Sequence, residues 1–350
     1  MNRIRSLDLA RGFTVFFIPA IHTGMLYSRL IVHKSVLGIF LIAIAEGPGG
    51  QMLMLLMGVS FALKSDHTFK SILARAFWLL ILGYLLNTLK FVWPYEFGWL
   101  PAGVLEALGI HKSDSVTQRL FSMGDILHFA AIAQCILYGL YRLRNYQWWA
   151  FVGAATIAVL SPLLWDRQPA LPVLHYLAGL ATGRPPKVFF PLFPWLVYPL
   201  TGLCIGYYLK QDQPETMKRC GITGIILLTG GFVWQLFNPV VDPDGFYRTP
   251  VNVTCWHLGV VLVCLSCWHL IATRIRSNLF FDLLSYSSKN ITLIYLIQWV
   301  MICWLLPVFG FRELDAVHSA IVMTVTTADT YILTFFINRI KQRYEHNKSF

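Results

Sequence analysis

The chain has 350 residues, of which 56% are hydrophobic and only 13% are charged, and its mean hydropathy is +0.59. This composition excludes an ordinary water-soluble domain and indicates an integral, multi-pass membrane protein. In a soluble protein the net charge of +11 would suggest a nucleic-acid partner. In a membrane protein it indicates basic cytoplasmic loops, so we expect membrane lipid and no nucleic acid as a partner.

Ten apolar runs are long enough to cross about 30 Å of hydrocarbon. They lie at about residues 9–32, 48–64, 71–92, 121–141, 147–165, 188–209, 220–238, 253–273, 290–308 and 317–338. The first run lacks the cleavage site of a signal peptide, so we expect it to remain as an anchor. A shorter apolar piece at 36–45 precedes EGPGG, and we interpret it as a re-entrant or interfacial element that leads into the second span. The sequence thus predicts one domain over residues 1–350, an all-α polytopic bundle of about ten transmembrane helices.

The distribution of Lys and Arg predicts the orientation of this bundle. With the N-terminus in the cytoplasm, 18 of the 28 basic residues lie inside. This bias favours an N-in, C-in topology, and we expect the inner (cytoplasmic) membrane of a bacterium. The long connections near 93–120, 166–187 and 239–252 then lie outside, where a polar acceptor could be recognised. The ten basic residues expected outside are Arg29, Lys34, Lys90, Lys112, Arg119, Arg167, Arg184, Lys187, Arg248 and Arg312.

The first apolar run carries polar residues at a regular spacing. Arg11, His22 and His33 are eleven residues apart. In one straight helix they would lie along one face, about 16 Å from one to the next. Pro19 should bend such a helix just before His22. In the alternative interpretation Arg11 reaches the lipid headgroups, Asp8 neutralises it, and His22 hydrogen-bonds to a neighbouring helix.

Further ionisable residues lie at the ends of predicted helices. Asp125 and His128 are three residues apart, hence on one helix face, although a capped helix start would also explain them. Glu46 precedes the GPGG turn, where it could face an outer cavity or simply water. Arg75 and Lys289 lie near inner helix ends and could hold phosphates, but the bias of basic residues toward the cytoplasm also explains them.

The remaining polar residues give weaker predictions. Asp329 lies within the last run and has no obvious partner there. The seven cysteines lie mostly in apolar runs, and their CxxC at 264–267 has no second pair, so we expect no metal site. Six amide side chains are expected to form polar contacts between helices: Gln51, Asn87, Gln134, Gln235, Asn290 and Gln298.

Four stretches, in matching order, resemble one known family. RIRSLDLARGF, with His22 ten residues after Gly12, resembles the opening of transmembrane acyltransferases, whose first helix carries Arg-X10-His, here Arg11 and His22. MGDILHFAAIA (123–133) and FFPLFPWLVYPLTGLCIGYYL (189–209) are similar to elements of the heparan-α-glucosaminide N-acetyltransferase-like catalytic domain family, which is related to the acyltransferase-3 proteins. SYSSKNITLIYLIQW (285–299) is similar to an element that opens a late helix of these proteins.

The resemblance implies both a fold and an activity. It implies ten or eleven helices that carry an acyl group, usually acetyl, from cytosolic acyl-CoA to a hydroxyl or amine of a glycan outside. The wider superfamily uses a histidine at the position of His22, whereas lysosomal members use one just beyond the first helix, at the spacing of His33. Bacterial relatives often carry a later histidine where this chain has Gln298, so no catalytic role is carried over to that position.

We therefore expect an integral-membrane, acyl-CoA-dependent O- or N-acyltransferase, with acetyl-CoA as its donor substrate and a glycan as acceptor. Histidine suits the removal of the acceptor's proton because its ordinary pKa lies near the working pH. The expected catalytic residues are His22, His33, Asp125 and His128, and the residues expected to bind acyl-CoA are Arg11, Arg75 and Lys289.

Two other classes of function remain open. A transporter or flippase for a lipid-linked sugar would also use a polar cavity, but the sequence lacks matched interrupted helices in two halves. A structural or sensory protein would leave Arg11 and His22 unexplained. The sequence does not distinguish O- from N-acylation, acetyl from longer chains, direct transfer from an acyl-histidine intermediate, or a monomer from a homodimer.

Overall fold

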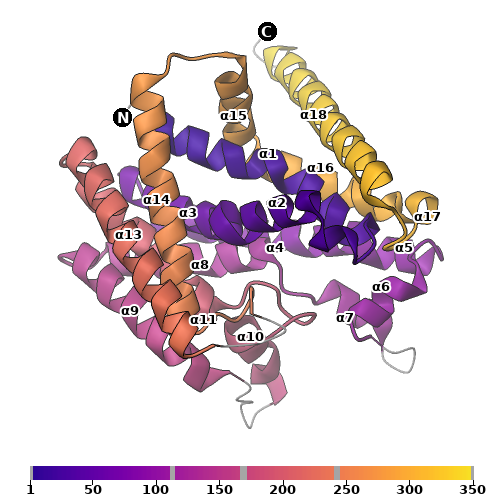
Figure 1. The fold of residues 1–350 in the computed structure, drawn as a ribbon, viewed down its shortest axis with the longest axis horizontal. Coiled ribbons are helices and arrows are strands. Elements are labelled where there is room, and N and C mark those ends of the chain that lie inside the picture. The colour runs from indigo at the N-terminus through magenta and orange to yellow at the C-terminus, as the bar shows by residue number, and fades with distance from the viewer. Residues whose placement is uncertain (1–2, 111–114, 166–171, 240–244, 348–350) are drawn as a thin grey trace.

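The computed structural model describes residues 3–110, 115–165, 172–239 and 245–347. Within these ranges the regular structure is helical, apart from two isolated bridges, Ser28 with Leu314 and Gly124 with Val188. Figure 1 shows α1 crossing the molecule, with α13 and α14 side by side on one flank.

The helices occur in the order α1 (Arg5–Tyr27), η1 (Val32–Lys34), α2 (Val36–Ile44), η2 (Ala45–Gly49), α3 (Gly50–Leu63), α4 (Phe69–Asn87), η3 (Thr88–Val92), α5 (Trp93–Glu96), α6 (Ala102–Ala107), α7 (Val116–Phe121), α8 (Ile126–Tyr141), α9 (Tyr146–Leu164), α10 (Pro172–Thr182), α11 (Leu192–Trp195), α12 (Val197–Leu209), α13 (Gln213–Phe237), α14 (Val251–Arg274), α15 (Leu279–Lys289), α16 (Ile291–Trp304), α17 (Leu306–Phe309) and α18 (Ala316–Asn347). In the described parts of the chain, eight helical stretches are long and apolar enough to cross a membrane. The shorter apolar helices α8 and α16 coincide with two further predicted spans. The chain is thus an all-helical, multi-pass membrane protein, while the count of ten spans stays a prediction.

Large apolar side chains are exposed on the outward faces of several long helices. In a membrane these faces contact lipid, because an apolar surface of this extent is not tolerated in water. Examples on α4, α9, α13 and α18 are Phe77, Trp78, Trp148, Phe151, Ile226, Trp234, Ile332 and Phe336.

The first helix is shorter than its apolar run, which corrects one prediction. α1 ends at Tyr27, and His33 lies in the separate short helix η1. The backbone after Tyr27 pairs with the segment before α18: Leu314 N–H donates to Tyr27 O (2.8 Å) and Arg29 N–H donates to Leu314 O (2.9 Å). These bonds replace further helical ones, so the prediction that His33 continues the line of Arg11 and His22 is wrong.

The piece at 36–45 leads directly into the second span, as predicted, while its re-entrant or interfacial placement stays a prediction. α2, η2 and α3 form one helical stretch, Val36–Leu63, in which Ala45–Gly49 (AEGPG) forms a π-helical turn. Neighbouring side chains satisfy backbone carbonyls there, since Thr14 Oγ1 donates to Pro48 O (3.2 Å) and Gln51 Nε2 donates to Glu46 O (3.2 Å). Such side-chain bonds are what allow Pro and Gly within a membrane helix.

Two glycines allow α3 and α12 to approach closely. A Cβ atom at Gly58 would lie 2.0 Å from Pro199 O, and one at Gly202 would lie 2.0 Å from Leu55 O. Small residues at facing positions are typical of helix contacts in membranes, where van der Waals packing drives association. This pair forms the centre of the bundle, next to α1 and α8.

Candidate active site

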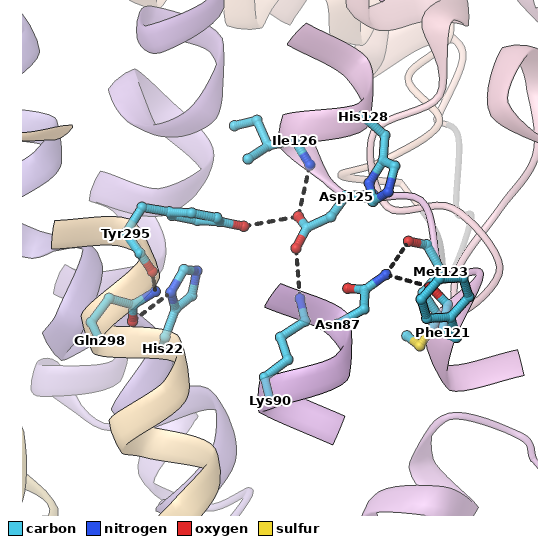
Figure 2. A network of polar contacts seen from close by, with 10 residues as sticks. All are labelled: His22, Asn87, Lys90, Phe121, Met123, Asp125, Ile126, His128, Tyr295 and Gln298. Atoms are coloured by element: carbon cyan, nitrogen blue, oxygen red, sulfur yellow. Dashed lines mark hydrogen bonds and ion pairs between the residues drawn. The ribbon is translucent and has the colours of Figure 1, made fainter. Parts of the chain in front are cut away.

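A buried polar cluster connects side chains from α1, η3, α8 and α16, as Figure 2 shows. Apolar helices surround it, so its hydrogen bonds act in a medium of low dielectric constant. Its members are His22, Lys90, Asp125, His128, Tyr295 and Gln298.

Asp125 holds the centre of this cluster. Its Oδ2 accepts from Lys90 Nζ (2.6 Å) and its Oδ1 accepts from Tyr295 Oη (2.9 Å) and from the N–H of Ile126 (2.7 Å). The side chains of Lys90 and Asp125 are only 4% and 7% exposed. Both carboxylate oxygens are therefore occupied, which suits a fixed ion that orients its neighbours rather than a free general base.

His128 closes the first turn of α8. Its Nδ1 accepts from the N–H of Asp125 (3.1 Å), and together the two residues form a capping box. The capped helix start that the sequence offered as an alternative is thus confirmed. Because Nδ1 accepts, the proton of the neutral ring lies on Nε2. That atom is buried and has no hydrogen-bond partner in the described structure.

A glycine of α4 makes room for the His128 ring. A Cβ atom at Gly83 would lie 2.7 Å from His128 Cε1. The ring also meets the edge of Tyr84, with centroids 4.5 Å apart.

His22 lies on the opposite side of the cluster from His128 and is only partly buried. Its Nδ1 is 3.1 Å from Gln298 Oε1, and its ring stacks on Trp299 with centroids 4.1 Å apart. Gln298 Nε2 donates in turn to the carbonyl of Tyr295 (3.1 Å), whose hydroxyl reaches Asp125. α16 thereby links His22 to Asp125, and three of the four predicted catalytic residues are brought together.

His33, the fourth, is not part of this cluster. Its Nε2 is 3.2 Å from the carbonyl of Gly24, and it makes no described contact with His22 or Asp125. The bond ties η1 back to the end of α1.

A first cavity, of about 490 Å³, lies where the N-terminal end of α1 meets the C-terminal end of α3. Arg11 lines it and donates to Ser60 Oγ (2.5 Å) and Leu56 O (3.3 Å). Of the other predicted phosphate ligands, Arg75 and Lys289 are exposed and do not line this cavity. The charged side chains that do line it are Arg3, Asp8, Arg11, Lys64 and Asp66.

A second cavity, of about 520 Å³, borders the residues that precede Asp125. Ser122 and Met123 line it, and the next residue is bonded to the opposite wall, since Gly124 N–H donates to Lys187 O (2.9 Å). The charged side chains that line it in the described structure are Arg119, Arg184, Lys187 and Arg248.

The sequence did not predict that Lys90 and Gln298 belong to the same cluster as His22. The sequence counts Lys90 only among outer cations, although its position inside the apolar stretch LNTLKFV indicates a residue that needs a partner. The expected helix-to-helix contact of Gln298 is confirmed by its bond to His22. Glu46 and Asp329 are exposed and make no described side-chain contact with the cluster. Within the described ranges no three His, Cys, Asp or Glu residues group as metal ligands.

A comparison with protein families gives a match. A family model described as "Heparan-alpha-glucosaminide N-acetyltransferase, catalytic" matches residues 3–230. The match includes three of the four resembling stretches, and with them His22, Lys90, Asp125 and His128. It ends before Tyr295 and Gln298, the contribution of α16 to the cluster. No curated protein matches the chain.

Proposed function

Because the chain belongs to the heparan-α-glucosaminide N-acetyltransferase catalytic domain family, which implies transferase activity, we propose that it is a membrane acyltransferase using cytosolic acyl-CoA. The acyl group, in this proposal acetyl, passes to a hydroxyl or amine of an extracytoplasmic glycan. The observation that carries the proposal is the His22 cluster, a partly buried imidazole held by Gln298 beside a buried ion pair.

Acyl transfer requires three tasks of the protein. The acceptor's proton must leave as its oxygen or nitrogen attacks the thioester carbon, the resulting oxyanion must be stabilised, and the CoA sulfur must depart. His22 takes the acceptor's proton and returns it to the departing sulfur. Asp125 accepts from Lys90 and from Tyr295 and so holds both side chains in place.

The cavity beside Arg11 suits the donor. CoA carries phosphates, which arginine and lysine bind through charge-assisted hydrogen bonds. Arg11 and Lys64 are both in its wall. Along α1, Arg11 is eleven residues from His22, about 16 Å, a distance that the pantetheine arm of CoA would bridge.

The cavity beside Asp125 suits the acceptor. It opens next to the start of α8, and its described lining is basic. This favours a glycan that carries an anionic group. Lys187 and Arg184 are exposed in its wall, where such a group could approach them.

The proposal is tested by thiol release from acetyl-CoA, using protein purified in detergent and a panel of amino and hydroxyl sugars. His22→Ala should lower turnover by at least about 100-fold, as expected for loss of a general base. His33→Ala should leave turnover within a few-fold of wild type, because its side chain is outside the cluster.

Two outcomes would contradict the proposal. If His22→Ala retains activity, the base lies elsewhere. If no acceptor supports turnover and acetyl-CoA does not bind, the acyltransferase assignment fails and a transporter or flippase for a lipid-linked sugar becomes the leading alternative.

A further inference from the structure

We infer that Gln298 is a positioning residue that fixes one tautomer of His22, with the proton on Nδ1, and so makes Nε2 the nitrogen that accepts the acceptor's proton. A neutral imidazole carries its proton on one of two nitrogens, and the hydrogen bond made by one nitrogen decides which. The role given to Nε2 rests on the proposed function, whereas the tautomer is a property of the protein alone.

The orientation of the Gln298 amide follows from its two contacts. The carbonyl oxygen of Tyr295 can only accept a hydrogen bond, so the group 3.1 Å from it must be the NH₂ of Gln298. The other end of the amide, Oε1, then faces His22 Nδ1 at 3.1 Å. Because Oε1 can only accept, Nδ1 must carry the proton. Gln298 is fully buried, so bulk water does not compete for either end.

The plane of the imidazole is fixed as well. Trp299, the next residue of α16, stacks on the His22 ring at an interplanar angle of 25°. A half-turn of the ring would put a carbon atom against Gln298 Oε1 and lose the hydrogen bond. Nε2 points away from Gln298, as Figure 2 shows, and has no hydrogen-bond partner among the described residues.

A neutral amide here does what a carboxylate does in a catalytic triad, without its charge. The charged and titratable side chains around His22 in Figure 2 are Lys90 of η3, Asp125 at the start of α8, His128 of α8 and Tyr295 of α16. Asp125 is committed to Lys90, Tyr295 and the backbone, and no contact joins it to His22 Nδ1. Gln298 is therefore the group that sets the tautomer.

Two variants of similar size separate this role from packing. Gln298→Met keeps the volume but cannot accept from Nδ1, so turnover should fall about 10- to 100-fold. Gln298→Glu still accepts from Nδ1, so it should retain more activity than Gln298→Met. The acid limb of its pH–rate profile should move to higher pH, because a carboxylate stabilises the protonated imidazole. Gln134→Met in α8 is the control, since Gln134 is also a buried amide but lies outside the cluster, and it should behave as wild type.

The tautomer is read directly from the nitrogen NMR spectrum of protein labelled with ¹⁵N-histidine, in which the His22 signals are those lost in His22→Ala. Wild type and Gln298→Glu should show the Nδ1–H form, and Gln298→Met should lose it. An Nε2–H form in the wild type, or a Gln298→Met variant with unchanged tautomer and turnover, would overturn the inference. Failure of the proposed function is recognised separately: the Nδ1–H form would be present, but no acceptor would support thiol release.

Discussion

At the scale of single residues, the buried pair of Lys90 and Asp125 is a costly feature that needs compensation. Removing two ions from water costs several kcal/mol each, and their attraction repays this only when the geometry is good and further hydrogen bonds are made. Here the ions are 2.6 Å apart, and Tyr295 and Ile126 supply two further bonds to the carboxylate. The pair fixes the start of α8 relative to η3, and with it the place of His128.

Removing the charge of only one partner should strongly lower the stability of the protein. Asp125→Asn leaves a buried ammonium without a counter-ion, which costs about 3–5 kcal/mol. Lys90→Met should cost a similar amount because it leaves the carboxylate uncompensated. The double variant should recover most of this loss, since neither charge is left alone. Thermal unfolding of the four proteins in one detergent measures the coupling, and additive losses in the double variant would contradict the role given to the pair.

The sequence predicts the individual residues of the candidate site better than it predicts the contacts between them. Arg11, His22, Asp125 and His128 stand out because polar groups in apolar runs are costly and therefore informative. The partner of Asp125 could not be predicted, because Lys90 is 35 residues away in sequence and Tyr295 is 170 residues away. Only the packing of α4, α8 and α16 brings them together.

At the scale of helices, the π-helical turn η3 carries a residue of the candidate site, Lys90. η3 ends α4 and presents Lys90 to the interior. Its widened backbone is satisfied from neighbours, since Trp304 Nε1 donates to Leu89 O (2.7 Å). Turns of this kind occur often at functional sites, which agrees with the position of Lys90 in the cluster.

The contact between α3 and α12 should not tolerate a side chain at Gly202. Gly202→Ala would place a Cβ atom 2.0 Å from the carbonyl oxygen of Leu55, so the helices must separate. We expect a loss of about 1–3 kcal/mol in stability, as for other overpacked sites. The matched control is Gly230→Ala in α13, where the Cβ atom would meet nothing within 4 Å. Equal unfolding temperatures for the two variants in detergent would show that the close approach is not required.

Hydropathy predicted where most helices lie, because burial in lipid demands long apolar runs, but it did not predict where they end. α1 stops at Tyr27 since the following backbone pairs with Leu314, a residue far along the chain. The EGPGG stretch indicated a break, yet Thr14 of α1 supports the carbonyl of Pro48 and the helix continues. Both differences come from tertiary contacts that a single segment does not reveal.

At the scale of the whole molecule, helix ends that the Lys and Arg pattern assigns to the same side of the membrane contact each other. Arg5 at the start of α1 donates to Ala272 O and Ile275 O, at the end of α14 (both 3.1 Å). At the other end of α1, Arg29 donates to Glu313 O (2.7 Å) before α18. The two ends of α1 thus contact different neighbours, the end of α14 and the segment before α18, while the orientation of these ends in the membrane stays a prediction from the Lys and Arg bias.

That orientation decides whether the cavity beside Arg11 can receive cytosolic acyl-CoA, and it can be measured. In a variant whose seven cysteines are replaced, single cysteines are introduced at Gln211, between α12 and α13, and at Arg312, before α18. Both positions are exposed and lie outside the membrane-spanning helices. A membrane-impermeant maleimide added to intact cells should label Arg312→Cys, and should label Gln211→Cys only after the membrane is permeabilised. The reverse pattern would place the cavity beside Arg11 outside the cytoplasm, where acyl-CoA is not supplied, and would contradict both the N-in, C-in prediction and the proposed route of the donor.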